Sequence, residues 1–265
     1  MRILFVGDVF GSAGRRIVRE HLPHVIENHK VSLVVVNGEN AAGGFGLTPS
    51  LAEELFDLGA HVITTGNHVW DKRELMDYTG SAQAAGHDRQ RRVLRPANYA
   101  PGNPGFGVYQ GDLDSGVAYA VINLQGRVFM ASSDDPFRKA DELLAGITAK
   151  VILVDFHAEA TSEKAALGWY LDGRVTAVLG THTHVPTADE RILPNGTAYQ
   201  TDVGMSGPYD SVIGVQREQA MQRFLTGMPA KFEAAKGNPK MCAALIECDA
   251  ATGRALSIRR LMLGE

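Results

Sequence analysis

Five short polar clusters in this 265-residue chain contain the side chains that hold metal ions in hydrolytic enzymes. Each cluster stands where a short apolar run ends, and in chain order they are Asp8, Glu39-Asn40, Asn67-His68, His157 and His182-Thr183-His184. Carboxylates, amide oxygens and imidazoles form the mixed oxygen and nitrogen set that suits Mn, Fe or Zn. The clusters therefore predict a metal-dependent hydrolytic centre.

The chemistry of such a centre explains why these residue types occur together. Two divalent cations about 3.5–4 Å apart polarise the oxygens of a phosphate diester and lower the pKa of a bound water. Such a pair needs a bridging carboxylate and several further oxygen or imidazole ligands. The ligands we expect are Asp8, Glu39, Asn40, Asn67, His157, His182 and His184. We assign His68, beside Asn67, as the general acid that protonates the leaving alkoxide.

The elements that must position these clusters are predicted to be buried parallel strands. Five runs are short, rich in β-branched residues and free of polar alternation, at 3–6, 33–36, 62–63, 151–154 and 177–179. This pattern is typical of strands that are buried on both faces. In an open α/β sheet, ligands bind outside the carboxyl ends of the strands. The five clusters should therefore meet at one site.

Between these runs the apolar residues take helical spacing. One stripe contains Ile17, Val18, Leu22, Val25 and Ile26, and another, after the start signal Thr48-Pro49-Ser50, contains Leu51, Leu55 and Leu58. Further strands are expected at 117–124, 127–130, 241–248 and 256–263, the first two crossing into a second sheet. We interpret 80–104 as loops and short elements over one edge of the site. The alternation of strands and helices predicts a layered α/β fold.

Composition bounds the size and setting of the protein. With 45% hydrophobic and 21% charged residues, we expect a single domain over residues 1–265. A net charge of −4 argues against a broad footprint for duplex nucleic acid. Because the sequence shows neither a bilayer-spanning stretch nor a signal-peptide layout, we expect a cytoplasmic protein.

Cys242 and Cys248 should lie on one face of one strand as reduced thiols.

Each cluster taken alone has a simpler explanation. Asp8 could cap a helix, Glu39-Asn40 could form a turn, and Asn67-His68 could belong to a tight strand-to-helix connection. A single histidine such as His157 is more often a hydrogen-bonded structural residue than a ligand. The cluster His182-Thr183-His184 is harder to explain that way, because two imidazoles beside a buried strand end are costly to satisfy. Five clusters at successive strand ends favour the metal centre.

The order of the motifs resembles that of the calcineurin-like metallophosphoesterase superfamily. Its motifs run as an early Asp, a second acidic cluster, Gly-Asn-His, a later His and a closing Gly-His-x-His. Two positions depart from this pattern. Asp8-Val9-Phe10 stands where the superfamily usually has Asp-x-His, and Glu39 stands where it usually has a bridging Asp. The first metal thus lacks an imidazole ligand, which Asn40 would replace.

These departures resemble the narrower group of YmdB-like bacterial phosphodiesterases. The contiguous strings that match the group are 3–11, 37–44, 66–71, 155–164 and 180–187. The resemblance spans nearly the whole chain and implies a single metallophosphoesterase domain. It also implies a four-layer α/β/β/α sandwich with two central mixed sheets, a di-iron or di-manganese centre, and hydrolysis of cyclic nucleotides, notably 2′,3′-cyclic AMP.

The resemblance further implies a role for each ligand. Glu39 would bridge the two metal ions. One ion would be held by Asp8, Asn40 and His184, and the other by Asn67, His157 and His182. A metal-bound hydroxide would attack phosphorus in line, with His68 as proton donor.

Two alternative functions stay open, namely a phosphomonoesterase or nucleotidase, and a regulatory scaffold that binds a nucleotide. We expect a small phosphoester substrate, leave RNA ends open as substrates, and expect a homo-oligomer.

Overall fold

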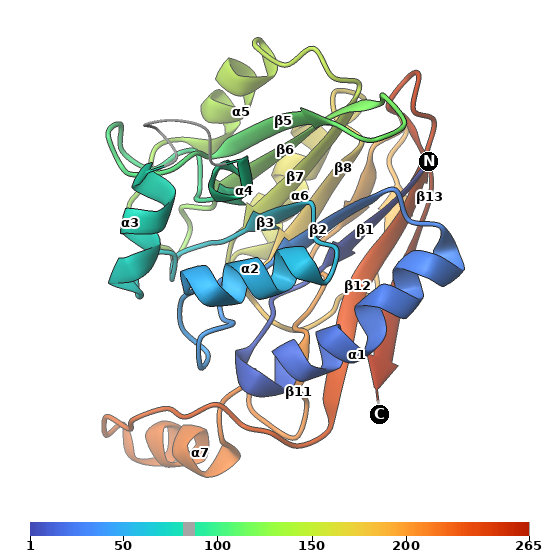
Figure 1. The fold of residues 1–265 in the computed structure, drawn as a ribbon. Helices are drawn as coiled ribbons and strands as arrows, with labels where there is room; N and C mark the ends of the chain where they lie inside the picture. Colours follow the sequence, from blue (N-terminus) through green and yellow to red (C-terminus); the bar gives the residue numbers. More distant parts are fainter. Residues whose placement is uncertain (82–87, 265) are drawn as a thin grey trace.

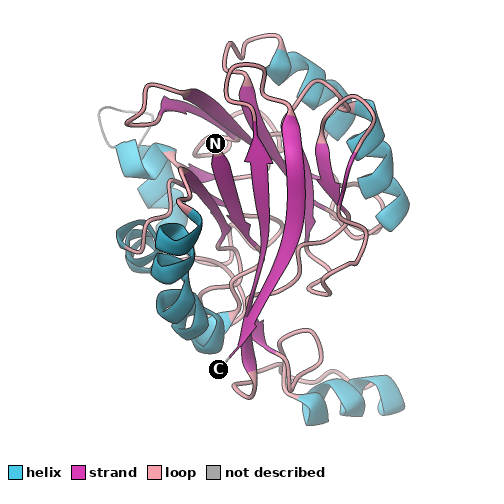
Figure 2. Ribbon diagram, turned by 90° about the vertical axis from the view of Figure 1, so that its right-hand side faces the viewer, coloured by secondary structure: helices cyan, strands magenta, loops and turns pink. Residues whose placement is uncertain are grey.

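Two β-sheets packed face to face form the centre of the molecule, and helices cover their outer faces (Figures 1 and 2). The computed structural model describes residues 1–81 and 88–264. Along those residues, no helix combines the length and apolar character needed to cross a bilayer. The layer order of helices, sheet, sheet and helices confirms the α/β/β/α architecture expected from the resemblance.

Both sheets are mixed, as predicted. The order across the first sheet is β11 (Gly207–Pro208), β12 (Pro239–Cys248), β1 (Arg2–Val6), β2 (Leu33–Asn37), β3 (Val62–Thr64) and β4 (Val93–Leu94), with β13 (Ala255–Gly264) paired to β12. The order across the second is β5 (Val108–Asp112), β6 (Ala118–Gln125), β7 (Val151–His157), β8 (Ala177–Thr181), β10 (Ala198–Gln200) and β9 (Arg191–Ile192). Strands β1 to β4 are parallel, and so are β6, β7, β8 and β10.

The helices are divided between the two outer faces. The first sheet is covered by α1 (Gly11–His29), α2 (Pro49–Asp57) and α3 (Arg73–Ser81), and the second by α5 (Pro136–Leu144) and α6 (Thr161–Tyr170). The short α4 (Asp88–Arg91) precedes β4. Outside the layers, at the bottom of Figure 1, lies α7 (Arg217–Thr226). The start signal of α2 is confirmed, because the Thr48 hydroxyl accepts the N–H of Leu51 at 3.3 Å.

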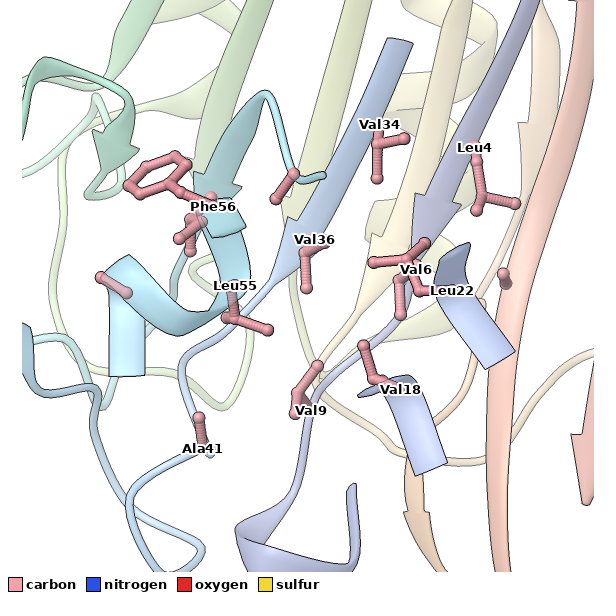
Figure 3. Close-up of a cluster of buried hydrophobic side chains, with 14 of the residues drawn as sticks. Leu4, Val6, Val9, Val18, Leu22, Val34, Val36, Ala41, Leu55 and Phe56 are labelled. Atoms are coloured by element: carbon pink, nitrogen blue, oxygen red, sulfur yellow. The ribbon is translucent and has the colours of Figure 1, made fainter. Parts of the chain in front are cut away.

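Alternating side chains along β1 explain why this strand has no polar face. Leu4 belongs to the same buried cluster as Val18 and Leu22 of α1, on the outer side of the sheet (Figure 3). Ile3, next to it in the chain, points the other way and belongs to the buried cluster between the two sheets that also contains Leu153 of β7. Each such buried side chain stabilises the fold by about 1.5–3 kcal/mol relative to exposure. The unalternated apolar runs are therefore strands buried on both faces, as predicted.

One predicted strand, at 127–130, is wrong. A turn occupies these residues, directly after β6. The buried carboxylate of Glu163 in α6 accepts the backbone N–H groups of Arg127 and Val128, both within 3.0–3.1 Å. Phe129 then adopts a positive φ of 61°, which no strand contains. The chain leaves the sheet here because a carboxylate far along the sequence takes the N–H groups that a neighbouring strand would need.

The middle stretch 80–104 contains short elements, as predicted. Residues 82–87 within it lie outside the described residues. The strand β4 within this stretch pairs with β3 and extends the first sheet, which the sequence did not predict. Arg89 of the basic run pairs with the carboxylates of Glu53 and Asp57 at 2.6 and 2.8 Å. Arg89 therefore forms ion pairs at the surface of the protein.

The two cysteines are free thiols on β12, as predicted, and both are buried. Burial raises the pKa of the Cys242 thiol to about 11. Burial also raises the pKa of Cys248 to about 11. Because the thiolate is the reactive form, these cysteines have a structural role.

A buried ion pair holds the loop that follows β8. Lys164 Nζ of α6 lies 2.7 Å from Asp202 Oδ2, and the two side chains are 1% and 0% exposed. The same Asp202 oxygen accepts the backbone N–H of Thr183 at 3.1 Å and its hydroxyl at 2.7 Å. The pair thus fixes the segment between His182 and His184.

Replacing Lys164 with Met should therefore destabilise the protein strongly, since it leaves the Asp202 carboxylate buried without its cation. We expect a loss of about 3–5 kcal/mol in the free energy of unfolding, measured by urea denaturation. The matched control is Lys139→Met, whose partner Glu142 has a side chain 68% exposed, and which should lose less than about 1 kcal/mol. Equal losses in the two variants would contradict the assignment.

Candidate metal centre

The five predicted clusters meet at the carboxyl ends of strands from both sheets. Asp8 follows β1, Glu39 and Asn40 follow β2, Asn67 and His68 follow β3, His157 ends β7, and His182 and His184 follow β8. Most of these side chains are buried, and those of Asp8 and His157 are fully so. Since β7 and β8 belong to the second sheet, the site depends on the packing of one sheet against the other.

Four of these side chains direct possible ligand atoms at one another. His157 Nε2 lies 3.0 Å from Glu39 Oε1, 2.9 Å from Asn67 Oδ1 and 3.1 Å from His182 Nδ1. Ligand atoms of Glu39, His157 and His182 all lie within 4.8 Å of one another, as in a metal-binding group. Carboxylate and amide oxygens and an imidazole lone pair are all acceptors, so a cation stabilises their close approach.

A hydrogen-bond chain behind His157 decides which of its ring nitrogens faces this group. The Thr181 hydroxyl donates its proton to Asp155 Oδ1 at 2.7 Å. It can therefore only accept from His157 Nδ1, which lies 2.9 Å away. With a proton on Nδ1, Nε2 is the nitrogen that faces Glu39 and Asn67, and it can take either a metal ion or a second proton. Such an outer hydrogen bond is the usual support of a metal-ligating histidine.

The other two imidazoles are oriented by hydrogen-bond partners of the same kind. His184 Nδ1 donates to the carbonyl oxygen of Ile213 at 2.8 Å. His182 Nε2 lies 3.1 Å from Glu159 Oε2, which leaves its Nδ1 facing His157. Each ring thus has one nitrogen engaged by the protein and the other available to a ligand.

Asp8, Asn40 and His184 form the second part of the centre. His184 Nε2 lies 3.9 Å from Asp8 Oδ1. The Asn40 amide nitrogen donates to the carbonyl oxygen of Gly44 at 2.9 Å, which fixes the direction of its oxygen. Within the described structure, Asp8 Oδ1 and Asn40 Oδ1 are buried and accept no hydrogen bond. Buried acceptors rarely lack a partner, so these two oxygens fit a metal ion well.

Phe10 occupies the position at which the superfamily usually has a histidine ligand. Its ring meets the imidazole of His184 edge to face, with 5.5 Å between the ring centroids. It therefore packs beside the centre without offering it a ligand atom. The unsatisfied oxygen of Asn40 is the nearby group suited to replace the missing imidazole.

The pKa values of the site residues show that a positive charge is favoured beside Glu39. Burial lowers the pKa of His157, but the charge and hydrogen bond of Glu39, with the charges of Asp8 and Asp155, together outweigh burial and raise that pKa to about 9. Burial raises the pKa of Glu39, but the charge and hydrogen bond of His157, with the charges of His68 and His182, together outweigh burial and lower that pKa to about 2. Burial, followed by the charge on His157, lowers the pKa of His182 to about 3. Burial raises the pKa of Asp8 to about 6.

The loop after β8 has an unusual backbone, which turns both of its histidines toward the centre. His182 has a φ of 96° and His184 a φ of 65°, in the left-handed region that costs a non-glycine residue about 1–3 kcal/mol. Thr183, between them, is held by Asp202. Residues two apart in an extended strand would share one face but could not turn independently toward two metal ions. The strained loop gives each ring its own direction.

Sequence reasoning missed the residues that support the ligands from behind. Asp155 accepts hydrogen bonds from Thr64 Oγ1 at 2.5 Å and Asn37 Nδ2 at 3.0 Å, in addition to Thr181. The available signal was the position of Asp155 two residues before His157 in an otherwise apolar strand, which places both on one face.

A cavity of about 460 Å³ opens beside the ligands. His68 lines it, and its backbone N–H donates to Glu39 Oε2 at 3.4 Å. His68 Nδ1 lies 2.9 Å from Asp71 Oδ2, which leaves Nε2 for a group in the cavity. The ring also meets Phe45 edge to face, with 5.1 Å between centroids. The predicted proton donor therefore lies at the cavity wall, next to the predicted ligands.

Comparison with known proteins agrees with the motifs. A family model described as YmdB-like protein matches residues 4–261. The chain belongs to this family. A 2′,3′-cyclic-nucleotide 2′-phosphodiesterase of Bacillus subtilis (strain 168) is 49% identical over 267 residues, which cover 100% of this chain and 98% of the relative.

Two solved structures have folds closely similar to that of this YmdB-like protein. A hypothetical protein from Thermus thermophilus superposes with a TM-score of 0.92 at 44% identity, covering 100% of both chains. A protein described as a novel phosphatase, from Mycoplasma pneumoniae, gives a TM-score of 0.91 at 35% identity, covering 100% of this chain and 93% of its own. With relatives named as a phosphodiesterase and a phosphatase, this chain is a phosphoric ester hydrolase.

Removing the hydroxyl behind His157 should weaken metal binding. In Thr181→Val the Nδ1–H of His157 loses its acceptor, so we expect Mn²⁺ affinity to fall about 10–100-fold, measured by competition with a chelator. The control is Thr226→Val, whose exposed hydroxyl bonds to backbone groups at the end of α7. If both variants bind Mn²⁺ as tightly as the wild type, Thr181 does not support a ligand.

Proposed function

We propose that this hydrolase is a dinuclear metal-dependent phosphodiesterase that acts on 2′,3′-cyclic nucleotides, with 2′,3′-cyclic AMP the first candidate. The observation that carries the proposal is the convergence of acceptor atoms around His157 Nε2, together with the unsatisfied oxygens of Asp8 and Asn40, beside a cavity. The substrate is suggested by the Bacillus subtilis relative, which covers the whole chain at 49% identity.

The metal ions would be held by the ligands that the motifs suggest. These are Glu39 as the bridge, Asp8, Asn40 and His184 for one ion, and Asn67, His157 and His182 for the other. The donor set of oxygens and imidazoles without thiolates suits Mn or Fe, and also Zn. Bound there, the ions would polarise the phosphoryl oxygens and lower the pKa of a water.

His68 would donate the proton that the leaving oxygen needs. Its Nδ1 donates to Asp71, so a proton on Nε2 is free to move to a group in the cavity. During hydrolysis the water would release one proton to solvent as its oxygen bonds to phosphorus, the P–O2′ bond would break, and the 2′ oxygen would take the Nε2 proton. The product would be a nucleoside 3′-phosphate. His68 then keeps its hydrogen bond to Asp71 as a neutral imidazole.

Substrate comparison tests the proposed reaction. Protein stripped with a chelator and reloaded with Mn²⁺ is offered 2′,3′-cyclic AMP and 3′-AMP, and the products are separated by chromatography. We expect metal-dependent release of 3′-AMP from the cyclic ester and no further hydrolysis. Turnover of 3′-AMP alone would indicate a phosphomonoesterase, an activity that the description of the Mycoplasma pneumoniae protein as a phosphatase suggests. Tight Mn²⁺ binding with no turnover would indicate a regulatory scaffold.

Two substitutions separate metal binding from proton donation. Glu39→Ala should lose metal and activity together, because it removes the carboxylate shared by both sets of ligands. His68→Ala should keep its metal content, measured by mass spectrometry of the dialysed protein, while kcat falls about 10²–10⁴-fold. Loss of metal from His68→Ala would show that His68 is a ligand and not the proton donor.

A further inference from the structure

Part of the lining of the cavity is apolar. Phe45 lines it from the loop after β2, and Ile213, Val215 and Phe232 line it from residues 209–238, the segment that carries α7 (Figure 1). These four side chains carry no hydrogen-bonding group. Hydrolysis of a phosphoester alone gives no reason for such a wall, because the phosphoryl group would lie against the proposed ligands.

The backbone holds this wall in place at a cost. Ile213 has a φ of 47°, which is a genuine outlier for a β-branched residue. Its carbonyl oxygen accepts the Nδ1–H of His184, so the same residue orients a proposed ligand. Its side chain is 53% exposed although it lines the cavity. Ile213 therefore combines a strained backbone with an exposed apolar side chain at the cavity. Such a combination indicates a ligand that covers the side chain.

We propose that the apolar wall of the cavity, formed by Phe45, Ile213 and Phe232, is the subsite for the base of a nucleotide. This inference rests on the proposed function and adds the part of the substrate that sets specificity. A nucleotide base is flat and has apolar faces, so any base can stack on aromatic side chains. The cavity volume of about 460 Å³ lies within the range of roughly 300–1,000 Å³ typical of small-molecule sites.

The chemistry of the wall predicts how bases are distinguished. The side chains of Phe45, Ile213 and Phe232 have no hydrogen-bond donors or acceptors that could distinguish the edge of adenine from that of guanine. The proposed subsite should therefore bind both bases alike. The larger ring system of a purine covers more apolar surface than a pyrimidine does. The enzyme should therefore discriminate by size, with purine 2′,3′-cyclic nucleotides preferred over pyrimidine ones.

Phe232 is the best residue to test, because its side chain has no group that could bind a metal ion or share a proton with His68. The substrates are 2′,3′-cyclic AMP and the base-free 2′,3′-cyclic phosphate of methyl riboside, both with the Mn²⁺-loaded full chain. In Phe232→Ala we expect KM for 2′,3′-cyclic AMP to rise about tenfold with kcat within about twofold of wild type. The base-free substrate, which cannot reach the wall, should show the same kcat/KM as with wild type.

The matched control is Phe224→Ala, from the same segment. Phe224 lies on α7, is 80% exposed and does not line the cavity. It should leave both substrates unaffected. An unchanged KM for 2′,3′-cyclic AMP in Phe232→Ala would overturn the subsite. An equal rise for both substrates would also overturn it, because it would show general damage to the cavity. Phe232→Leu, which keeps the site apolar, should raise KM less than Phe232→Ala.

Binding of adenosine separates failure of the subsite from failure of the proposed reaction. Ligand-observed NMR should show adenosine bound to the wild-type chain and to Phe224→Ala, and binding should weaken in Phe232→Ala. This readout does not depend on turnover. No adenosine binding to the wild-type chain would overturn the subsite even if 2′,3′-cyclic AMP is hydrolysed. Adenosine binding without hydrolysis would support the subsite and refute only the reaction.

Discussion

The structure depends on a close approach of buried acceptor atoms around His157 Nε2. A carboxylate oxygen of Glu39, an amide oxygen of Asn67 and a nitrogen of His182 all lie about 3 Å from it. Such groups repel one another unless a positive charge lies among them. The fold must therefore hold them rigidly, and most of the surrounding structure can be understood as the means of doing so.

Contact between the two sheets supplies that rigidity. Beneath the ligands, Asp155 of β7 accepts hydrogen bonds from Asn37 of β2 and Thr64 of β3, which belong to the other sheet. It also accepts one from Thr181 of β8, in its own sheet. Burial raises the pKa of Asp155, and these hydrogen bonds oppose that effect. Around them the apolar side chains between the sheets exclude water. A polar brace inside an apolar layer therefore fixes the position of His157 relative to the ligands of the first sheet.

The sequence predicted the strands and the convergence of their polar ends because those features depend on local pattern. Buried strands such as β1 and β2 have unalternated apolar residues, and parallel strands place their carboxyl ends at one edge. The proposed ligands were found in this way. The strand at 127–130 was wrong because its N–H groups are taken by Glu163, a contact between distant residues that no local pattern contains. The tautomer of His157 and the orientation of His184 were beyond prediction for the same reason, since they follow from Thr181 and from a carbonyl oxygen in a segment with no motif.

The most direct test of the account is the number of metal ions that the active protein requires. Metal-free chain is titrated with Mn²⁺, and bound metal per chain is measured alongside hydrolysis of 2′,3′-cyclic AMP. The account predicts that activity becomes maximal only when two ions are bound to each chain. Full activity with one ion per chain, or with none, would contradict a dinuclear centre.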